Sequence, residues 1–147
     1  FVTDPIDWIF IDHYIYDLFR TCTHVSVHCN LSAETRNLVN SARISMMPGI
    51  GLDGTLCGNH IVSCARGGIV DENAAADALE SGQLRSLALD VFETEPLGQS
   101  RLLDIDGFHG SPHIAASTLE AQSRIGTEMA SLLLEYFDTG DVRTSLN

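Results

Sequence analysis

Lysine is missing altogether from the 147 residues of this chain, and all eight basic side chains are arginines. Twenty Asp and Glu residues oppose them, so the formal net charge is -12 at pH 7. A chain with so little positive charge repels phosphate backbones and anionic membrane surfaces. We therefore expect neither a nucleic-acid partner nor a membrane partner.

Long apolar runs and paired cysteines are missing as well. No stretch approaches the roughly 18 apolar residues that a membrane-spanning helix needs. The four cysteines form no C-x-x-C pair, and no secretory signal precedes them, so we expect reduced thiols in a soluble, cytoplasmic protein. The first residue is Phe1 rather than methionine. This start indicates either a processed terminus or a piece of a longer chain.

The chain does contain short apolar runs that alternate with helical patterns, and its hydrophobic content is 44%. The runs are near-continuous in hydrophobicity, which is typical of parallel strands with both faces covered. They are Val25–Cys29, Ile61–Ala65 and Leu87–Phe92. The alternation predicts an α/β fold built on a partial doubly wound, Rossmann-like parallel sheet.

Three helices are predicted from their ends and their apolar faces. The first begins at Ser32 and continues to Met46. The second begins at Asp71 as N-cap and stops at Gly82, the expected left-handed position. The third begins at a capping box, residues 117–120, and carries an apolar stripe that ends near Gly140.

Polar segments follow each predicted strand: "VHCNLSAET", "ARGG" and "DVFETEP". In sheets of this type, ligands bind beyond the carboxyl ends of the strands. One such segment alone is best interpreted as a solvated loop. Three together predict a binding site at that edge.

Taken with "SPHIAAST" at residues 111–118, these segments resemble the D-2-hydroxyacid dehydrogenase family, and most of all its phosphoglycerate dehydrogenase branch. The resemblance extends from about Val25 to the end of the chain. That family has a nicotinamide-binding Rossmann domain beside a substrate domain, with hydride transfer in the cleft between them. The resemblance implies that residues 1–113 are a partial dinucleotide-binding domain. Residues 114–147 would be a helix returning toward a substrate domain that is mostly absent.

The resemblance implies three catalytic residues. Arg66 would bind the substrate carboxylate, a task that suits a planar and permanently charged fork. His113 would be the general acid and base, giving a proton to the carbonyl oxygen as hydride arrives. Glu95 would hydrogen-bond the imidazole, fix its orientation and favour its protonated form. Gly67 and Gly68 would let the backbone approach the ligand.

The same resemblance implies NAD as the coenzyme. Asp90, which ends "ALD", resembles the residue that binds the nicotinamide carboxamide. Asp4, in "FVTDP", resembles the residue that accepts hydrogen bonds from the ribose hydroxyls and favours NAD over NADP. His28, Cys64 and Ala65 complete the predicted coenzyme-binding set.

The sequence also contains a formal match to the dinucleotide-binding glycine motif, "GIGLDG" at Gly49–Gly54. The match follows a helical pattern rather than a strand, and no helical pattern follows it, so we expect no phosphate site there. In the family the link from this point to "ARGG" is shorter, which indicates an insertion around Ile50–His60. We expect the true phosphate loop and the first strand to be missing, and coenzyme binding by these 147 residues alone to be weak.

A metal site is not expected. His24 and His28 lie four residues apart on a predicted strand, with Cys22 and Cys29 nearby. A metal site is conceivable there, but the set has no tetrahedral ligand spacing.

Three functions remain open at this point. The first is an NAD-dependent dehydrogenase of D-2-hydroxy acids, with 3-phosphoglycerate as one candidate substrate and a homodimer or larger homo-oligomer as the assembly. The second is an NAD-responsive binding protein, because "VHCNL" also resembles the corepressors of this family. The third is an inactive, truncated fragment.

Overall fold

The computed structural model describes residues 14–141. Residues 1–13 and 142–147 lie outside the described range, so the predicted coenzyme residue Asp4 does too. The chain divides between His113 and Ile114 into two compact units. Each unit is described by itself below.

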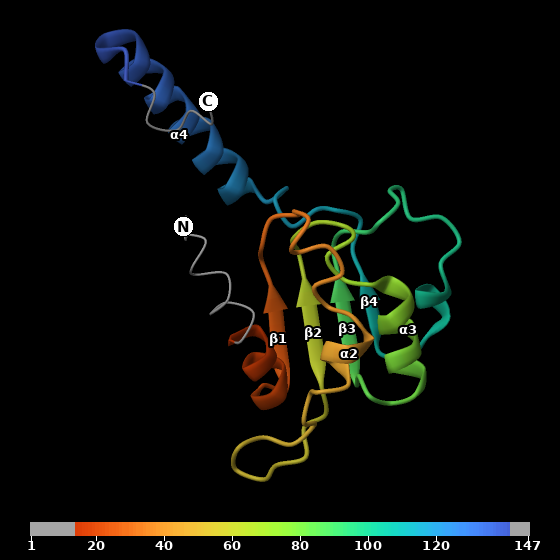
Figure 1. The fold of residues 1–147 in the computed structure, drawn as a ribbon. Helices are drawn as coiled ribbons and strands as arrows, with labels where there is room; N and C mark the ends of the chain where they lie inside the picture. The colour runs from red at the N-terminus through yellow and green to blue at the C-terminus, as the bar shows by residue number, and fades with distance from the viewer. Residues whose placement is uncertain (1–13, 142–147) are drawn as a thin grey trace. The chain divides into compact units, whose positions relative to one another are not determined.

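The first unit is built on a four-stranded parallel sheet whose strands follow one another in sequence order (Figure 1). The strands are β1 (His24–Val27), β2 (His60–Ser63), β3 (Ser86–Leu89) and β4 (Phe108–Gly110). Parallel strands in this order make up one half of a doubly wound sheet. The predicted Rossmann-like α/β fold is therefore confirmed.

The strands are shorter than predicted, and β4 was not predicted. The apolar runs continue past the strand ends because residues there are still buried: Ala65 is 6% exposed and Phe92 is 7% exposed. The apolar runs thus indicate which residues are buried, and the hydrogen bonds between strands end before the runs do. Strand β4 has only the three residues Phe108–Gly110, which are too few and too glycine-rich to give a strand pattern.

Burial alternates along β1, β2 and β3, so the described residues cover only one face of these strands closely. Val25, Val27, Ile61, Leu87 and Leu89 belong to one buried cluster with residues of α2 (Ser41–Ile44) and α3 (Glu72–Glu80). Both helices lie over the same face of the sheet (Figure 1). On the opposite face, side chains such as Ser26 and Val62 are exposed. The prediction of strands covered on both faces is wrong for the described part of the chain.

The first predicted helix is also wrong. Residues 33–37 form turns, and the helix α2 is only four residues long. Val39 instead pairs with Val70 in a parallel bridge, and Asn37 takes a left-handed conformation with φ 52°. The amide of Asn37 donates to the Gly68 carbonyl at 2.8 Å. Pairing with a segment about thirty residues away thus outweighs the local helical period.

The second predicted helix is confirmed as α3. The Asp71 side chain accepts a hydrogen bond from the Ala74 amide at 3.0 Å, as an N-cap does. The helix ends at Glu80, and Gly82 has φ 78° in the left-handed region. Both ends therefore follow the signals in the sequence.

The second unit is dominated by α4 (Leu119–Thr139), which confirms the third predicted helix. Its N-cap is Thr118, whose hydroxyl accepts from the Ala121 amide at 3.1 Å, so the cap lies one residue later than the predicted box. Gly140 ends the helix with φ 72°. No helix within residues 14–141 is long and apolar enough to span a membrane.

The segment predicted to be an insertion, around Ile50–His60, lies before β2, at the amino end of the sheet (Figure 1). Gly49–Gly54 lies in a turn that is closed by an antiparallel bridge between Ile50 and Leu56. The buried amide side chain of Asn59 ties this turn to the sheet: Oδ1 accepts from the Gly49 amide at 2.7 Å, and Nδ2 donates to the Gln83 carbonyl at 2.9 Å. This glycine segment is not a strand-to-helix phosphate loop. Because Arg66 follows the opposite end of β2, the length of that strand separates the insertion from it.

Candidate active site

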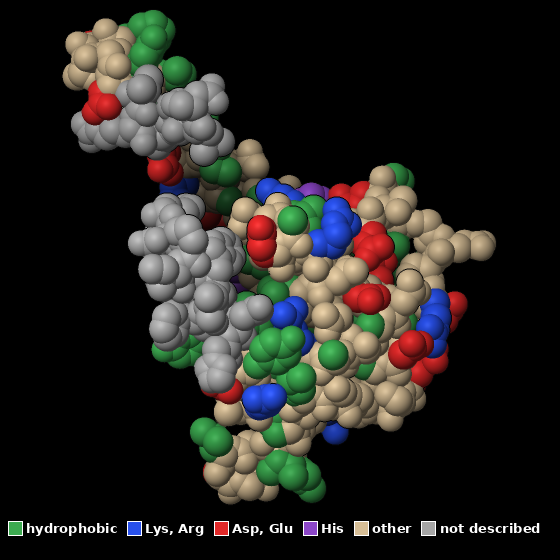
Figure 2. All heavy atoms as spheres, in the orientation of Figure 1, with side chains coloured by type: hydrophobic (Ala, Val, Ile, Leu, Met, Phe, Trp, Pro, Cys, Tyr) green, Lys and Arg blue, Asp and Glu red, His purple; other side chains and the backbone are tan. Residues whose placement is uncertain are grey.

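Within residues 14–141, the predicted site residues lie beyond the carboxyl edge of the sheet, because each one follows the end of a parallel strand. The last paired residues of the four strands lie in register: Val27, Ser63, Leu89 and Gly110. The next residue along each strand is a polar one: His28, Cys64, Asp90 and Ser111. Basic and acidic side chains lie next to one another over the loops beyond this edge (Figure 2). Three of these four positions were predicted to bind the coenzyme.

His113 and Glu95 form the best-defined pair at this edge. His113 Nδ1 lies 2.8 Å from Glu95 Oε2. The hydrogen bond from His113, aided by the Phe92 amide on Oε1, holds the pKa of Glu95 below its ordinary value of 4.5. An ionised carboxylate accepts only, so Nδ1 must donate. This leaves Nε2 as the ring atom for exchanging a proton with a substrate.

The backbone at His113 is held in an unfavourable conformation. Its φ is 55°, in the left-handed region that non-glycine residues rarely occupy and that costs about 1–3 kcal/mol. The preceding Ser111 fixes this segment, because its amide donates to the Leu89 carbonyl and its carbonyl accepts from the His113 amide, both at 3.0 Å. Such strain is typical of functional positions.

Arg66 lies exposed two residues beyond Cys64, and its Nη1 donates to the Ala65 carbonyl at 2.7 Å. Gly67 and Gly68 were predicted to let the backbone approach a ligand. The structure gives each of them a different reason. A Cβ on Gly67 would lie 1.9 Å from the carbonyl oxygen of Phe92, and Gly68 has φ 81°. Gly67 therefore permits close packing against the chain's own Phe92 backbone, which joins the Arg66 loop to the loop that carries Glu95.

Asp90 is buried at the end of β3, with 3% of its surface exposed. Its amide donates to the Ser63 carbonyl at 3.0 Å. Its Oδ1 accepts a hydrogen bond from the Ser111 hydroxyl at 2.5 Å. Ser111 was not among the predicted site residues, and its only signal in the sequence is a hydroxyl placed two residues before His113.

Two cavities meet at this edge. One of about 630 Å³ is lined by the ends of β1 and β2: His28, Cys29, Asn30, Leu31, Cys64, Ala65 and Arg66. Burial raises the pKa of the Cys29 thiol there. A smaller cavity of about 190 Å³ includes Asp90 and Ser111 and shares Cys64 with the first. The predicted residues His28, Cys64, Ala65 and Arg66 thus line one space, with Asp90 in the adjoining one.

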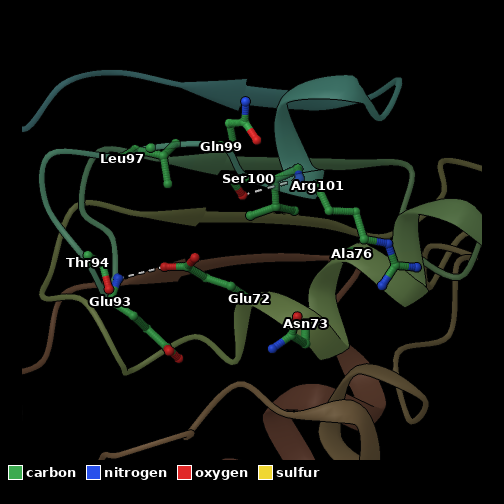
Figure 3. A pocket seen from close by; sticks show the side chains of 11 residues that line it. Glu72, Asn73, Ala76, Glu93, Thr94, Leu97, Gln99, Ser100 and Arg101 are labelled. Atoms are coloured by element: carbon green, nitrogen blue, oxygen red, sulfur yellow. Dashed lines mark hydrogen bonds between the residues drawn. The ribbon is translucent and has the colours of Figure 1, made fainter.

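A third cavity, of about 430 Å³, lies between α3 and the segment of residues 93–102 (Figure 3). Glu72 crosses it, accepting from the Glu93 amide at 2.6 Å. Arg101 pairs with Asp77 and Glu80 at its other end. None of Arg66, Glu95 and His113 lines this cavity. The bond between Glu72 and the Glu93 amide holds the loop that carries Glu95. The cavity itself is not part of the candidate active site.

The histidines considered for a metal site make other contacts. His24 stacks on His60 with ring centroids 4.4 Å apart. His28 Nε2 lies 2.6 Å from the Ser26 hydroxyl. The four cysteines are free thiols.

The sequence model of a known protein family matches most of this chain. The profile described as D-isomer specific 2-hydroxyacid dehydrogenase, NAD binding domain, matches residues 12–115. The chain belongs to this family. Arg66, Asp90, Glu95 and His113 all lie within the part that matches the NAD-binding domain of the D-2-hydroxyacid dehydrogenases.

Individual relatives agree with this assignment. A D-3-phosphoglycerate dehydrogenase of Methanocaldococcus jannaschii is 39% identical over 116 residues, which are 79% of this chain and 21% of the relative. A hydroxypyruvate reductase of Thermotoga maritima is 35% identical over 134 residues, 89% of this chain and 40% of the relative. The crystal structure of a glyoxylate reductase from Paecilomyes thermophila superposes with a TM-score of 0.76 and 30% identity, covering 90% of this chain and 38% of that one. The chain thus spans less than half the length of each.

Proposed function

We propose that the protein transfers a hydride between a nicotinamide coenzyme and the 2-carbon of a D-2-hydroxy acid or 2-oxo acid. The observation that carries this proposal is the hydrogen-bonded pair of His113 and an ionised Glu95 at the sheet edge that also presents Arg66. A histidine oriented in this way can give and take a proton at one ring nitrogen. A permanently charged guanidinium nearby suits a carboxylate substrate. Membership of the dehydrogenase family supports the same reading.

The described residues fit the nicotinamide half of the coenzyme. The adjoining cavities are lined by His28, Cys64, Ala65 and the buried carboxylate of Asp90. The Asp90 carboxylate accepts a hydrogen bond from the Ser111 hydroxyl, and a carboxylate has further lone pairs that can accept from the amide NH₂ of nicotinamide. When bound, the coenzyme supplies or accepts the hydride. The glycine segment Gly49–Gly54 does not take part, because it lies at the opposite end of β2.

The positions of the side chains support the following roles. Arg66 binds the substrate carboxylate and turns the 2-oxo group toward the histidine. His113 Nε2 donates a proton to the carbonyl oxygen during reduction and removes the hydroxyl proton during oxidation. Glu95 keeps the ring in place through Nδ1 and compensates its positive charge when it is protonated. Reduction and oxidation therefore need opposite protonation states of His113.

The substrate we propose first is the phosphoglycerate class, because the chain is 39% identical to a D-3-phosphoglycerate dehydrogenase. Hydroxypyruvate and glyoxylate are the alternatives named by other relatives. We also propose a homodimer or larger homo-oligomer and a cytoplasmic location, in keeping with the family. The division of the chain at His113 supports assigning residues 114–147 as the segment that returns toward a substrate domain.

The test is a set of NADH oxidation assays on the intact protein with 3-phosphohydroxypyruvate, hydroxypyruvate and glyoxylate. Turnover of at least one substrate is expected, with Arg66→Ala raising chiefly KM and His113→Ala lowering chiefly kcat. If the wild type binds NADH but turns over none of a broad set of 2-oxo acids, the proposal is wrong and an NAD-responsive binding function gains support. If the wild type binds no coenzyme, the hypothesis of an inactive fragment gains support.

A further inference from the structure

Ser111 makes contacts that connect two parts of the site. It is the first residue after β4, and its amide donates to the Leu89 carbonyl at 3.0 Å. Its hydroxyl donates to Asp90 Oδ1 at 2.5 Å, although the two residues are 21 positions apart. Ser111 therefore contacts the strand end of β3 through both its backbone and its side chain.

The side-chain bond restricts the Asp90 carboxylate. A hydrogen bond to a buried, charged acceptor is stronger than one between neutral groups, and Asp90 is 3% exposed. Fixing one oxygen stops rotation of the carboxylate about the Cβ–Cγ bond. Ser111 thereby restrains the direction in which Asp90 presents its lone pairs.

The backbone of Ser111 acts separately from its hydroxyl. Its carbonyl accepts from the His113 amide at 3.0 Å, and its amide bond to Leu89 anchors the start of this segment. Neither bond involves the side chain. Removing the hydroxyl therefore changes the fixation of Asp90 while leaving the anchors of the His113 loop in place.

We infer that Ser111 is a positioning residue for the coenzyme: its hydroxyl orients Asp90 to accept a hydrogen bond from the amide NH₂ of nicotinamide. The inference rests on the proposed function, since it assigns Asp90 to the nicotinamide. It predicts a loss of affinity confined to coenzymes that carry this NH₂ group. A serine that merely stabilises the fold has no such selectivity.

The experiment compares NADH with the reduced 3-acetylpyridine analogue, in which a methyl group replaces the NH₂, on the intact protein. With Ser111→Ala, the dissociation constant of NADH, measured by isothermal titration calorimetry, should rise about tenfold, since a hydrogen bond to a charged group is being lost. The dissociation constant of the analogue and kcat at saturating coenzyme should change less than about twofold, within what an independent site produces. Ser111→Thr, which keeps the hydroxyl, should restore the dissociation constant of NADH. Ser123→Ala, at an exposed position of α4, serves as the matched control.

Each outcome has one meaning. Equal losses for NADH and the analogue, or no loss with either, would overturn the role of Ser111. If the Ala variant does not fold, Ser111→Cys, which keeps the volume but donates weakly, takes its place with the same expected split. If the wild type neither binds NADH nor reduces any 2-oxo acid, the proposed function fails instead, whatever the variants do.

Discussion

Substitution of Gly67 tests how closely the loop that carries Arg66 packs against the loop that carries Glu95. The Cβ of Gly67→Ala would lie 1.9 Å from the Phe92 carbonyl oxygen, 2.4 Å from its carbonyl carbon and 2.9 Å from the Glu93 nitrogen. All three are backbone atoms, so no side chain can rotate away. A carbon–oxygen contact is normally about 3.3 Å, so the two loops must separate by about 1.4 Å.

This separation should reduce both stability and activity. Overpacking costs about 1–3 kcal/mol where side chains can adjust, and a rigid backbone contact places Gly67→Ala at or above about 3 kcal/mol in the free energy of unfolding. A displacement of about 1 Å between Arg66 and the His113–Glu95 pair should lower kcat/KM about 100-fold. Urea unfolding followed by circular dichroism measures the first, and NADH oxidation by the intact protein measures the second.

Gly98→Ala is the matched control, because it lies in the segment after Glu95 and a Cβ there would meet nothing within 4 Å. Its unfolding free energy should stay within about 0.5 kcal/mol of the wild type. The reasoning is refuted if Gly67→Ala unfolds at the same urea concentration as Gly98→Ala.

Three further predictions concern other contacts. Asn59→Ala should cost about 2 kcal/mol in urea unfolding, because it leaves the backbone groups of Gly49, Met47 and Gln83 without their side-chain partner, yet coenzyme affinity should not change. Asp71→Ala should cost about 1 kcal/mol as the N-cap of α3 is lost, which thermal unfolding will show. Because the folded pKa of Glu95 lies below 4.5, its stabilising effect is complete above that pH and is lost as the pH falls through the folded value. The stability difference between wild type and Glu95→Gln should therefore vanish in acid, and a difference that persists there would contradict the assignment.

The elements that the sequence predicted correctly are those whose signals are local. Asp71 and Gly82 specify the ends of α3 through contacts within a few residues of each end. Thr118 and Gly140 do the same for α4. The apolar runs located three of the four strands, because a buried strand needs a continuous run of apolar residues.

The elements that the sequence missed depend on distant partners. The helix expected at Ser32–Met46 is reduced to the four residues of α2, since Val39 pairs with Val70. The contact between Ser111 and Asp90 depends on the register of β3 and β4. The reason for Gly67 is the backbone of Phe92, 25 positions along the chain. No local pattern encodes these pairings.

In the candidate site, too, some features could be predicted from the sequence and others depend on contacts between distant segments. The family resemblance named Arg66, Asp90, Glu95 and His113, and the structure brings Glu95 into hydrogen-bond contact with His113. Their catalytic roles remain predictions. The left-handed backbone of His113 and the support of Asp90 by Ser111 became visible only in three dimensions.

The central claim is that hydride passes between nicotinamide and the 2-carbon of the acid. It is tested most directly by incubating the intact protein with a 2-oxo acid and NADH that carries deuterium at the transferable position, followed by mass spectrometry of the 2-hydroxy acid formed. The account predicts one deuterium at carbon 2 of a D-configured product, and loss of that product in His113→Ala. A product without deuterium, or undiminished formation by the variant, would contradict it.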